Sequence, residues 1–505
     1  MSPIFKKYKN MKKNIFNVAL LLLLAFVAGA CSDSDDTKKV DNGRRSGAAT
    51  QLIVLDNAEN ELSNLSFSLG ASNYIVGINC DGDWTATVDA DWVKLSNYAG
   101  YGFTNKNSYT RVSVDKNPGE QRTATLTVKS GNITRTVTIT QKGSSKDPGD
   151  NFMSAFEFVE NLKMGYNLGN TLDCNPDITD PSTASWFKPT SDLDWETVWG
   201  QPKTTQAIID AIAEKGFNVI RVPVTWYPHM DADGNVNEVW MTRVQEVVDY
   251  VINAGCYCIL NVQHDSGTRG GRTDGAGWLQ ASETEYPQTS VKFKKLWTQI
   301  ATRFKDYDDK LLFEAFNEIL DNSDNWGDPA DASAYSAITK LEQDFVDVVR
   351  STGGNNEFRN LVVNPYSAGS TAARLAGFQC PNDKHPAHLL ASVHSYDPYW
   401  FCNDSDDAAS QDYYINMFDS SCQADIDGVF QRIDARFLSE LGMPYFLGEF
   451  GAIGTHPDIS ERVKYAKYMK QKMTQYGTAG LWWMGLYDRK KGEWYEEEIV
   501  NALFQ

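Results

Sequence analysis

From residue 151 onward the chain alternates short apolar runs with longer amphipathic stretches, and this alternation constrains its fold more than any other feature. Helical patterns lie between the runs, for example at 204–215, 241–253, 291–304 and 334–350. The strand-like runs are eight: 164–168, 217–224, 256–263, 311–318, 361–366, 389–396, 445–451 and 480–485. Repeated strand–helix units build a parallel sheet, so eight of them predict a (β/α)8 barrel of the α/β class. A doubly wound sheet is the alternative, but no Gly-x-Gly-x-x-Gly follows the first run.

Two of these runs end in carboxylates. The run 311–318 closes with Asn317 and Glu318, and the run 445–451 carries Glu449 near its end. Packing of a buried strand does not require such polar residues. Barrels of this type place their active sites at the carboxyl ends of the strands, so both glutamates are expected on one rim. This position favours a catalytic role for the two carboxylates as a pair.

Other runs also carry polar or aromatic residues toward their ends. These residues are Arg221, His264 (preceded by Gln263), His394, Tyr396 and Trp483. Each has a structural alternative, since Arg221 can be a buried ion-pair partner of Glu314 and both histidines can be satisfied core residues. Their concentration on one predicted rim favours an active site over that alternative.

Residues 1–30 have the pattern of a secretory signal, with five lysines, an apolar run at 18–27 and small residues before Cys31. The small residues before that cysteine resemble the lipobox of bacterial lipoproteins, which implies lipid attachment at Cys31 and anchoring to a membrane. The acidic start of the tether 31–50 resembles the surface-export tag of Bacteroidetes lipoproteins, which implies the cell surface at the outer membrane. The alternatives are an ordinary cleaved signal and a start at Met11 rather than Met1.

Charge and cysteine content limit the partners. Loss of residues 1–30 removes five lysines and no acid, which changes the net charge from −19 to −24. The phosphates of nucleic acid are repelled by such a chain, whereas a neutral polysaccharide is compatible with it. We expect a monomer. Of the eight cysteines, Cys402 and Cys422 bracket an acidic loop and either pair in an oxidising compartment or stay free.

Residues 51–143 predict a small all-β sandwich of immunoglobulin-like type, because short alternating segments are separated by turn residues. Trp84 and Trp92 bracket Thr-Ala-Thr-Val, and the module ends Val-Thr-Ile-Thr-Gln-Lys-Gly. This combination resembles the BACON domain. The aromatic residues that would serve sugar binding are Trp84, Trp92, Tyr98, Tyr101 and Phe103, but we favour a stalk with both tryptophans in its core. Residues 144–151 form a linker by composition, and residues 152–505 form the barrel.

The rim residues together resemble glycoside hydrolase family 5. Two further segments, Asn-Leu-Gly-Asn-Thr-Leu-Asp at 167–173 and Trp-Gly-Gln-Pro-Lys-Thr-Thr at 199–205, resemble its subfamily 4 of endoglucanases and xyloglucanases. The chain departs from the pattern in two places. Relatives often have His-His where this chain has Gln263-His264, and Trp-Asp-Asn where Met484-Gly485 follows Trp483.

The resemblance implies a role for each residue of the rim. Glu318 is the acid/base and Glu449 the nucleophile of a retaining enzyme. Arg221 and Tyr396 stabilise the ionised form of Glu449. The remaining roles are a hydrogen bond from Asn317 to the sugar 2-hydroxyl, a stacking surface from Trp483, and a polar floor made by His264 and His394. No metal or organic cofactor is required.

The same resemblance implies a β-1,4-glucan substrate. Xyloglucan is expected within that class, because a soluble polymer can diffuse to an enzyme that is tethered to a surface. Mixed-linkage glucan, cellulose and mannan are alternatives, and a non-catalytic surface glycan-binding lipoprotein is an alternative of another class. Tryptophans in predicted rim loops form extended subsites or anchor their loops: Trp186, Trp278, Trp326 and Trp400.

Overall fold

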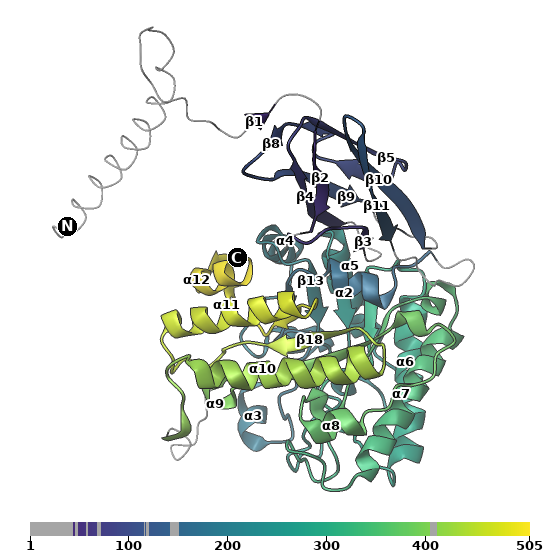
Figure 1. Ribbon diagram of the computed structural model, residues 1–505. Helices are drawn as coiled ribbons and strands as arrows, with labels where there is room; N and C mark the ends of the chain where they lie inside the picture. Colours follow the sequence, from purple (N-terminus) through teal and green to yellow (C-terminus); the bar gives the residue numbers. More distant parts are fainter. Residues whose placement is uncertain are drawn as a thin grey trace, which may run out of the picture. The chain divides into compact units, whose positions relative to one another are not determined.

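The computed structural model describes residues 44–45, 49–56, 59–67, 72–115, 117, 121–141, 151–403 and 412–505. These residues form two compact units, one rich in strands and one built around a barrel (Figure 1). The predicted signal, the lipidation site at Cys31 and most of the predicted linker lie outside the described residues. The predicted domain boundaries therefore stay predictions.

The barrel is a closed ring of eight parallel strands, which confirms the predicted α/β fold. Its first strand, β12, pairs with both β13 and β19, so the ring closes between the first and last strands of the domain. The strands are β12 (Gly165–Asn167), β13 (Val219–Val222), β14 (Tyr257–Leu260), β15 (Leu311–Glu314), β16 (Leu361–Val363), β17 (Leu389–Ser395), β18 (Tyr445–Phe450) and β19 (Gly480–Trp482).

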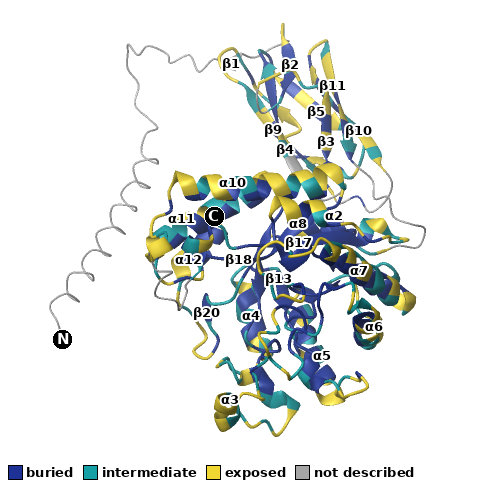
Figure 2. Cartoon of the chain, turned by 90° about the horizontal axis from the view of Figure 1, so that it is seen from below, coloured by how far each residue is buried: buried dark blue, intermediate teal, exposed yellow. Residues whose placement is uncertain are grey.

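Amphipathic helices follow the strands, as the sequence predicts. Figure 2 shows the strands in the dark blue of buried residues, with helices around them whose outer faces are exposed. The main helices are α4 (Gln206–Glu214), α5 (Glu238–Asn253), α6 (Tyr286–Arg303), α7 (Ser333–Ser351), α8 (Ala372–Gly377), α10 (Ser420–Asp434), α11 (Ile459–Gln475) and α12 (Glu497–Leu503).

An apolar layer fills the amino-terminal end of the barrel. Helix α2 (Ala155–Asn161) contributes Phe158, whose ring packs edge-on against Phe446 with centroids 6.2 Å apart. The inward side chains of this layer come from seven strands: Val219, Ile259, Leu312, Val362, Leu390, Phe446 and Leu481. Because side chains alternate along a strand, the next inward positions are polar, namely Arg221 in β13 and Glu314 in β15. The alternation therefore places charged groups next to the apolar layer, on its side toward the carboxyl ends of the strands.

The described residues of the amino-terminal module form two larger sheets and a two-stranded pair of β1 (Arg44–Arg45) with β8 (Gly102–Phe103), and the all-β prediction is confirmed. One sheet has the order β2 (Leu52–Leu55), β4 (Ser72–Cys80), β9 (Ser108–Val114) and β6 (Val93–Leu95). The other has the order β3 (Asn64–Phe67), β11 (Ile133–Gln141), β10 (Arg122–Ser130), β5 (Trp84–Val88) and β7 (Ala99–Gly100). Trp84 is a core residue, as predicted, whereas Trp92 is only half-buried and Tyr98 and Tyr101 are exposed.

The described cysteines are all free thiols. Cys402 donates to the carbonyl of Asp397 and Cys422 to the carbonyl of Met417, so the pairing considered for these two cysteines is not formed. Among the helices of the described residues, none has the length and apolar character needed to cross a membrane.

Candidate active site

The predicted rim residues come together at the carboxyl ends of the barrel strands. Arg221 lies in β13, His394 in β17 and Glu449 in β18. Asn317 and Glu318 follow β15, Tyr396 follows β17 and Trp483 follows β19. Residues more than 250 positions apart in the sequence therefore share one site, as the barrel prediction requires.

The two glutamates are close enough to act on one bond. A carboxylate oxygen of Glu318, one of Glu449 and a ring nitrogen of His394 all lie within 4.8 Å of one another. The side chain of Glu318 is 21% exposed, whereas that of Glu449 is 6% exposed. One carboxylate is thus open to a substrate and to water, and the other is enclosed by the protein.

Each oxygen of Glu449 has its own donor. Arg221 donates from Nη1 to Oε1 at 2.8 Å, and the Tyr396 hydroxyl donates to Oε2 at 2.8 Å. These two bonds fix the plane of the carboxylate and stabilise its ionised form. The partners predicted for Glu449 from the sequence are the ones that contact it.

Burial has a larger effect on Glu449 than the sequence suggests. Loss of hydration raises the pKa of this carboxyl, although His394, Arg221 and the hydrogen bond from Tyr396 oppose the rise. The charge of the neighbouring Glu318 raises the pKa of Glu449 further. The carboxyl of Glu449 therefore keeps its proton up to a higher pH than an exposed glutamate would.

His394 connects the two carboxylates. Its Nδ1 lies 2.8 Å from Glu318 Oε1 and 3.7 Å from Glu449 Oε2. Burial lowers the pKa of His394, but both glutamates outweigh burial and raise it above its ordinary value. His394 is therefore a contact of the acid/base candidate and belongs to the site, not to the apolar core.

A β-bulge gives Glu449 its orientation. Val393 of β17 pairs with Leu447 of β18, but the next residue, His394, pairs with Glu449, so Gly448 is an extra residue in β18. Strict alternation from the inward Phe446 would point Glu449 toward the helices. The extra residue reverses the alternation and turns Glu449 into the barrel.

A side chain at residue 448 would force its neighbours to move. A Cβ atom on residue 448 would lie 2.1 Å from Ser392 Oγ and 3.1 Å from His394 Nε2. The Gly-Glu-Phe sequence at 448–450 therefore has a physical reason in the geometry of the site.

Asn167, at the end of β12, and Asn317, which follows β15, both hold Arg221. Asn317 Oδ1 accepts from Arg221 Nη2 at 2.8 Å, which leaves the amide nitrogen of Asn317 to donate to a substrate hydroxyl. Asn167 Oδ1 accepts from Arg221 Nη1 at 3.0 Å, and its amide nitrogen donates to the carbonyl of Gly448 at 3.0 Å. Asn167 opens the segment 167–173 and ends the first barrel strand, but nothing in the sequence marks it as a partner of Arg221.

Gln263 and His264 differ in burial and in the groups that they contact. Gln263 is buried, and its side-chain oxygen accepts from the Asn261 amide at 2.6 Å. His264 is half-buried and meets the edge of Trp199, with ring centroids 5.8 Å apart. Burial lowers the pKa of His264, while the charges of Asp173 and Glu318 raise it. Burial has the larger effect, so the pKa of His264 lies below its ordinary value, while the side chain of Gln263 holds Asn261.

Trp483 is half-buried at the end of β19. A Cβ atom on Gly169 would lie 3.1 Å from its ring and 3.3 Å from Met484, so the loop after β12 passes close to both side chains. The stacking role of Trp483 stays a prediction.

A hollow of about 450 Å³ adjoins Glu318. Its lining includes His394 and Tyr396, together with the exposed rings of Trp326 and Tyr399. Flat apolar faces beside hydroxyl-binding groups suit a polysaccharide. Of the other rim tryptophans, Trp186 is 62% exposed.

Trp278 and Trp400 have contacts within the protein. The indole of Trp278 donates to Asp265 at 2.6 Å, and Trp400 stacks on Tyr413 at 5.5 Å. Both contacts favour the loop-anchor alternative for these two residues.

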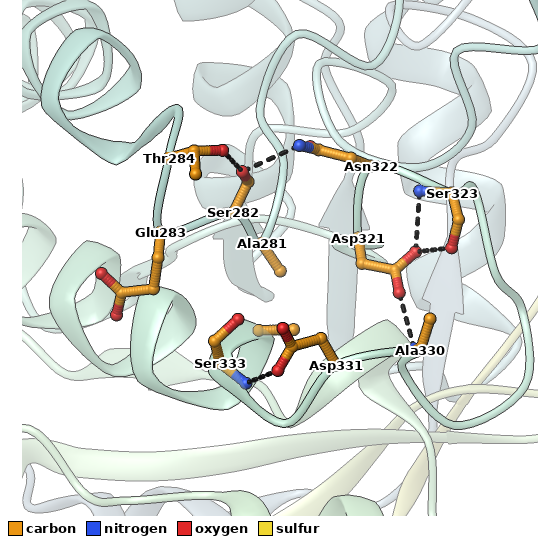
Figure 3. A pocket seen from close by; sticks show the side chains of 11 residues that line it. Ala281, Ser282, Glu283, Thr284, Asp321, Asn322, Ser323, Ala330, Asp331 and Ser333 are labelled. Atoms are coloured by element: carbon orange, nitrogen blue, oxygen red, sulfur yellow. Dashed lines mark hydrogen bonds between the residues drawn. The ribbon is translucent and has the colours of Figure 1, made fainter.

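A second hollow lies between the segments that precede α6 and α7 (Figure 3). Its carboxylates already bind neighbouring groups, since Asp321 accepts from Ser323 and Ala330 and Asp331 accepts from the backbone of Ser333. None of its described lining residues is aromatic. It therefore lacks the features of a sugar-binding subsite.

A closed (β/α)8 barrel with two adjacent rim glutamates, one partly exposed and one held by arginine and tyrosine, defines a barrel glycoside hydrolase. Comparison with known families agrees with this class. Residues 183–485 match the family described as "Cellulase (glycosyl hydrolase family 5)", and the chain belongs to that family. Residues 82–142 match the BACON family, described as "Putative binding domain, N-terminal".

Three relatives illustrate the similarity. Endoglucanase A of Clostridium longisporum is 33% identical over 70% of this chain, which spans 66% of that protein's length. The xyloglucan-specific endo-beta-1,4-glucanase BoGH5A of Bacteroides ovatus is 26% identical over 98% of this chain and 96% of its own length. The structure of a mutant of PbGH5A from Prevotella bryantii B14, in complex with a xyloglucan tetradecasaccharide, is 38% identical, with a TM-score of 0.62, over 70% of this chain and 99% of that chain.

Proposed function

We propose that this protein is a retaining endo-β-1,4-glucanase with xyloglucan as its preferred substrate. The observation that carries the proposal is the contact geometry of the two carboxylates, which lie within 4.8 Å of each other. Retaining glycosidases have carboxyl groups about 5–5.5 Å apart, whereas inverting enzymes separate them by about 6.5–9.5 Å to admit a water molecule.

The reaction proceeds in two displacements. Glu449 attacks the anomeric carbon, the glycosidic bond breaks, and Glu318 gives its proton to the departing sugar oxygen. Glu318, now ionised, then takes a proton from water, whose oxygen displaces Glu449 from the anomeric carbon. Both glutamates return to their starting protonation states.

The neighbouring side chains assist each displacement. Arg221 and Tyr396 bind the charge of Glu449 in the free enzyme and as it leaves. Asn317 is placed beside Arg221 to donate to the 2-hydroxyl, a bond that strengthens toward the transition state.

Xyloglucan is supported by two relatives and by a physical argument. The Bacteroides ovatus relative that matches nearly the whole chain is named xyloglucan-specific, and the Prevotella bryantii structure holds a xyloglucan oligosaccharide. A soluble, branched polymer also suits an enzyme held at a surface. We further propose that Cys31 carries that anchor, so that Cys31→Ser releases the protein from membranes to the soluble fraction.

Product analysis tests the proposal. The protein from residue 37 onward is incubated with xyloglucan, barley mixed-linkage glucan, carboxymethyl cellulose and mannan, in parallel with Glu449→Ala. Glu440→Ala is the matched control, because Glu440 is 62% exposed and pairs only with Arg436 among the described ion pairs. Xyloglucan is expected to fall to oligosaccharides fastest, with Glu449→Ala inert and Glu440→Ala fully active.

Other outcomes separate the alternatives. Preference for mannan or mixed-linkage glucan would agree with the proposed hydrolase activity but would contradict the proposed preference for xyloglucan. Binding of polymer without cleavage would favour the glycan-binding alternative and overturn the enzymatic proposal.

A further inference from the structure

A second glutamate shares Arg221 with the nucleophile candidate. Glu314 is fully buried in β15, four residues before Glu318. Its Oε2 lies 2.6 Å from Arg221 Nε, and its Oε1 accepts from the Asn364 amide at 3.1 Å. The reaction described above assigns no step to this carboxylate.

Glu314 completes the set of partners around the guanidinium. The Nε of Arg221 binds Glu314, Nη1 binds Glu449 and Asn167, and Nη2 binds Asn317. Every nitrogen of the planar group is therefore held, and a shift at Nε turns the other two. The position of Glu314 sets the positions of the donors that face Glu449 and Asn317.

The charge on Glu314 also reaches the reacting groups. Burial raises the pKa of Glu314, but the adjacent Arg221 and the nearby His394 outweigh burial and bring it below its ordinary value. Glu314 is therefore ionised at neutral pH. One arginine serves two carboxylates, so its charge favours ionised Glu449 less than it would in an isolated pair.

We propose that Glu314 is a positioning residue of the active site, which aligns Arg221 with Glu449 and Asn317 and moderates the charge that Arg221 presents to Glu449. This role rests on the proposed glycosidase function. The charged and titratable groups that face Glu449 are Arg221 from β13, Glu318 after β15, and His394 and Tyr396 from the β17 segment.

Glu314→Gln tests the charge without removing the hydrogen bonds. The glutamine oxygen can accept from Arg221, and its amide nitrogen then faces Asn364. The side-chain oxygen of Asn364 has no hydrogen-bond partner within the described structure, so the Asn364 amide can turn over and accept. Loss of one negative charge near Glu449 lowers the pKa of Glu449. The acidic limb of the kcat/KM profile on xyloglucan is expected to move to lower pH by about one unit.

Glu342→Gln is the matched control. Glu342 of α7 is also fully buried, and it accepts from the backbone of Asn364 at 2.7 Å. Burial raises the pKa of Glu342 well above its ordinary value and so favours its neutral form, and the substitution is expected to change the local charge less than Glu314→Gln does. The acidic limb of the kcat/KM profile of Glu342→Gln is expected to match that of the unaltered enzyme.

Glu314→Asp tests the alignment separately and replaces the glutamine variant if that protein fails to fold. It keeps the charge but withdraws the carboxylate by one methylene, so kcat is expected to fall at least tenfold while the acidic limb stays in place. An unmoved limb in folded Glu314→Gln, or an unchanged kcat in folded Glu314→Asp, would overturn the proposal. Failure of the unaltered protein to cleave any glucan would instead overturn the proposed function.

Discussion

At the scale of the residue, burial and the neighbouring donors have opposite effects on the pKa of Glu449. Burial disfavours its ionised form, and the contacts with Arg221 and Tyr396 favour it. The charge of the neighbouring Glu318, like burial, raises the pKa of Glu449. The protonation state needed for attack therefore depends on single hydrogen bonds, each of which can be removed by one substitution.

Tyr396→Phe removes the bond to Glu449 Oε2 and leaves the ring in place. A hydrogen bond to an ionised acceptor is worth about 1.5–3 kcal/mol, so the pKa of Glu449 is expected to rise by roughly one unit or more. The acidic limb of the kcat/KM profile moves to higher pH, opposite in direction to Glu314→Gln. A limb that stays in place or moves downward would show that Tyr396 does not act on Glu449.

Much of this site follows from the sequence, because polar residues at the ends of apolar runs have few structural explanations. The rim positions of Glu318, Glu449 and His394 are of this kind. The contact of Arg221 with both Glu314 and Glu449, in contrast, does not follow from the sequence. Its partners Glu314 and Glu449 lie 93 and 228 residues away, and only closure of the barrel decides that both reach one guanidinium. The sequence offers an ion pair with Glu314 only as an alternative to a functional role for Arg221. In the structure, Arg221 binds Glu314 and also contacts the nucleophile candidate Glu449.

At the scale of the element, all eight strands were predicted, but the predicted runs are longer than the strands. The run 311–318 contains β15 only as Leu311–Glu314, although Ala315 and Asn317 still donate backbone hydrogen bonds to Val362 and Val262, and Ala315 and Phe316 remain packed in the core. Hydrophobicity alone does not mark the point where pairing ends. The bulge at Gly448 was also beyond prediction, since it depends on the register between two strands.

Gly448→Ala tests whether the bulge orients Glu449. The added methyl group collides with Ser392 Oγ, so either strand must shift, and kcat is expected to fall at least tenfold. Overpacking of this kind lowers the free energy of unfolding by about 1–3 kcal/mol. Activity is measured beside chemical denaturation to separate the two effects.

Ser392→Ala supplies the control and the rescue. Ser392 Oγ has no hydrogen-bond partner within the described residues, so its removal alone is expected to leave activity within about twofold. Combined with Gly448→Ala it removes the closest contact and should restore part of the lost activity. A double variant no better than Gly448→Ala would contradict this explanation of the glycine.

At the scale of the whole molecule, every candidate site residue comes from the barrel, between Asn167 and Trp483. The strand-rich module contributes none of them. If the module is a stalk, as its sequence favours, chemistry on a soluble polymer does not require it.

Removal of residues 1–150 is therefore expected to leave kcat/KM on soluble xyloglucan within about twofold, because the charges and hydrogen bonds around Glu449 are retained. The two proteins are compared at equal concentrations with folding checked by circular dichroism. A large rise in KM with unchanged kcat would assign substrate binding to the module and reject the stalk.

The stereochemistry of the first product tests the central claim, that Glu318 and Glu449 form a retaining pair. Proton NMR follows the anomeric signal of the new reducing end during the first minutes of xyloglucan hydrolysis, before mutarotation equilibrates it. We expect the β-anomer to appear first and the α-anomer to grow in later, because two displacements restore the original configuration. Initial release of the α-anomer would mean a single displacement by water, which this pair of carboxylates, within 4.8 Å of each other, leaves no room to perform.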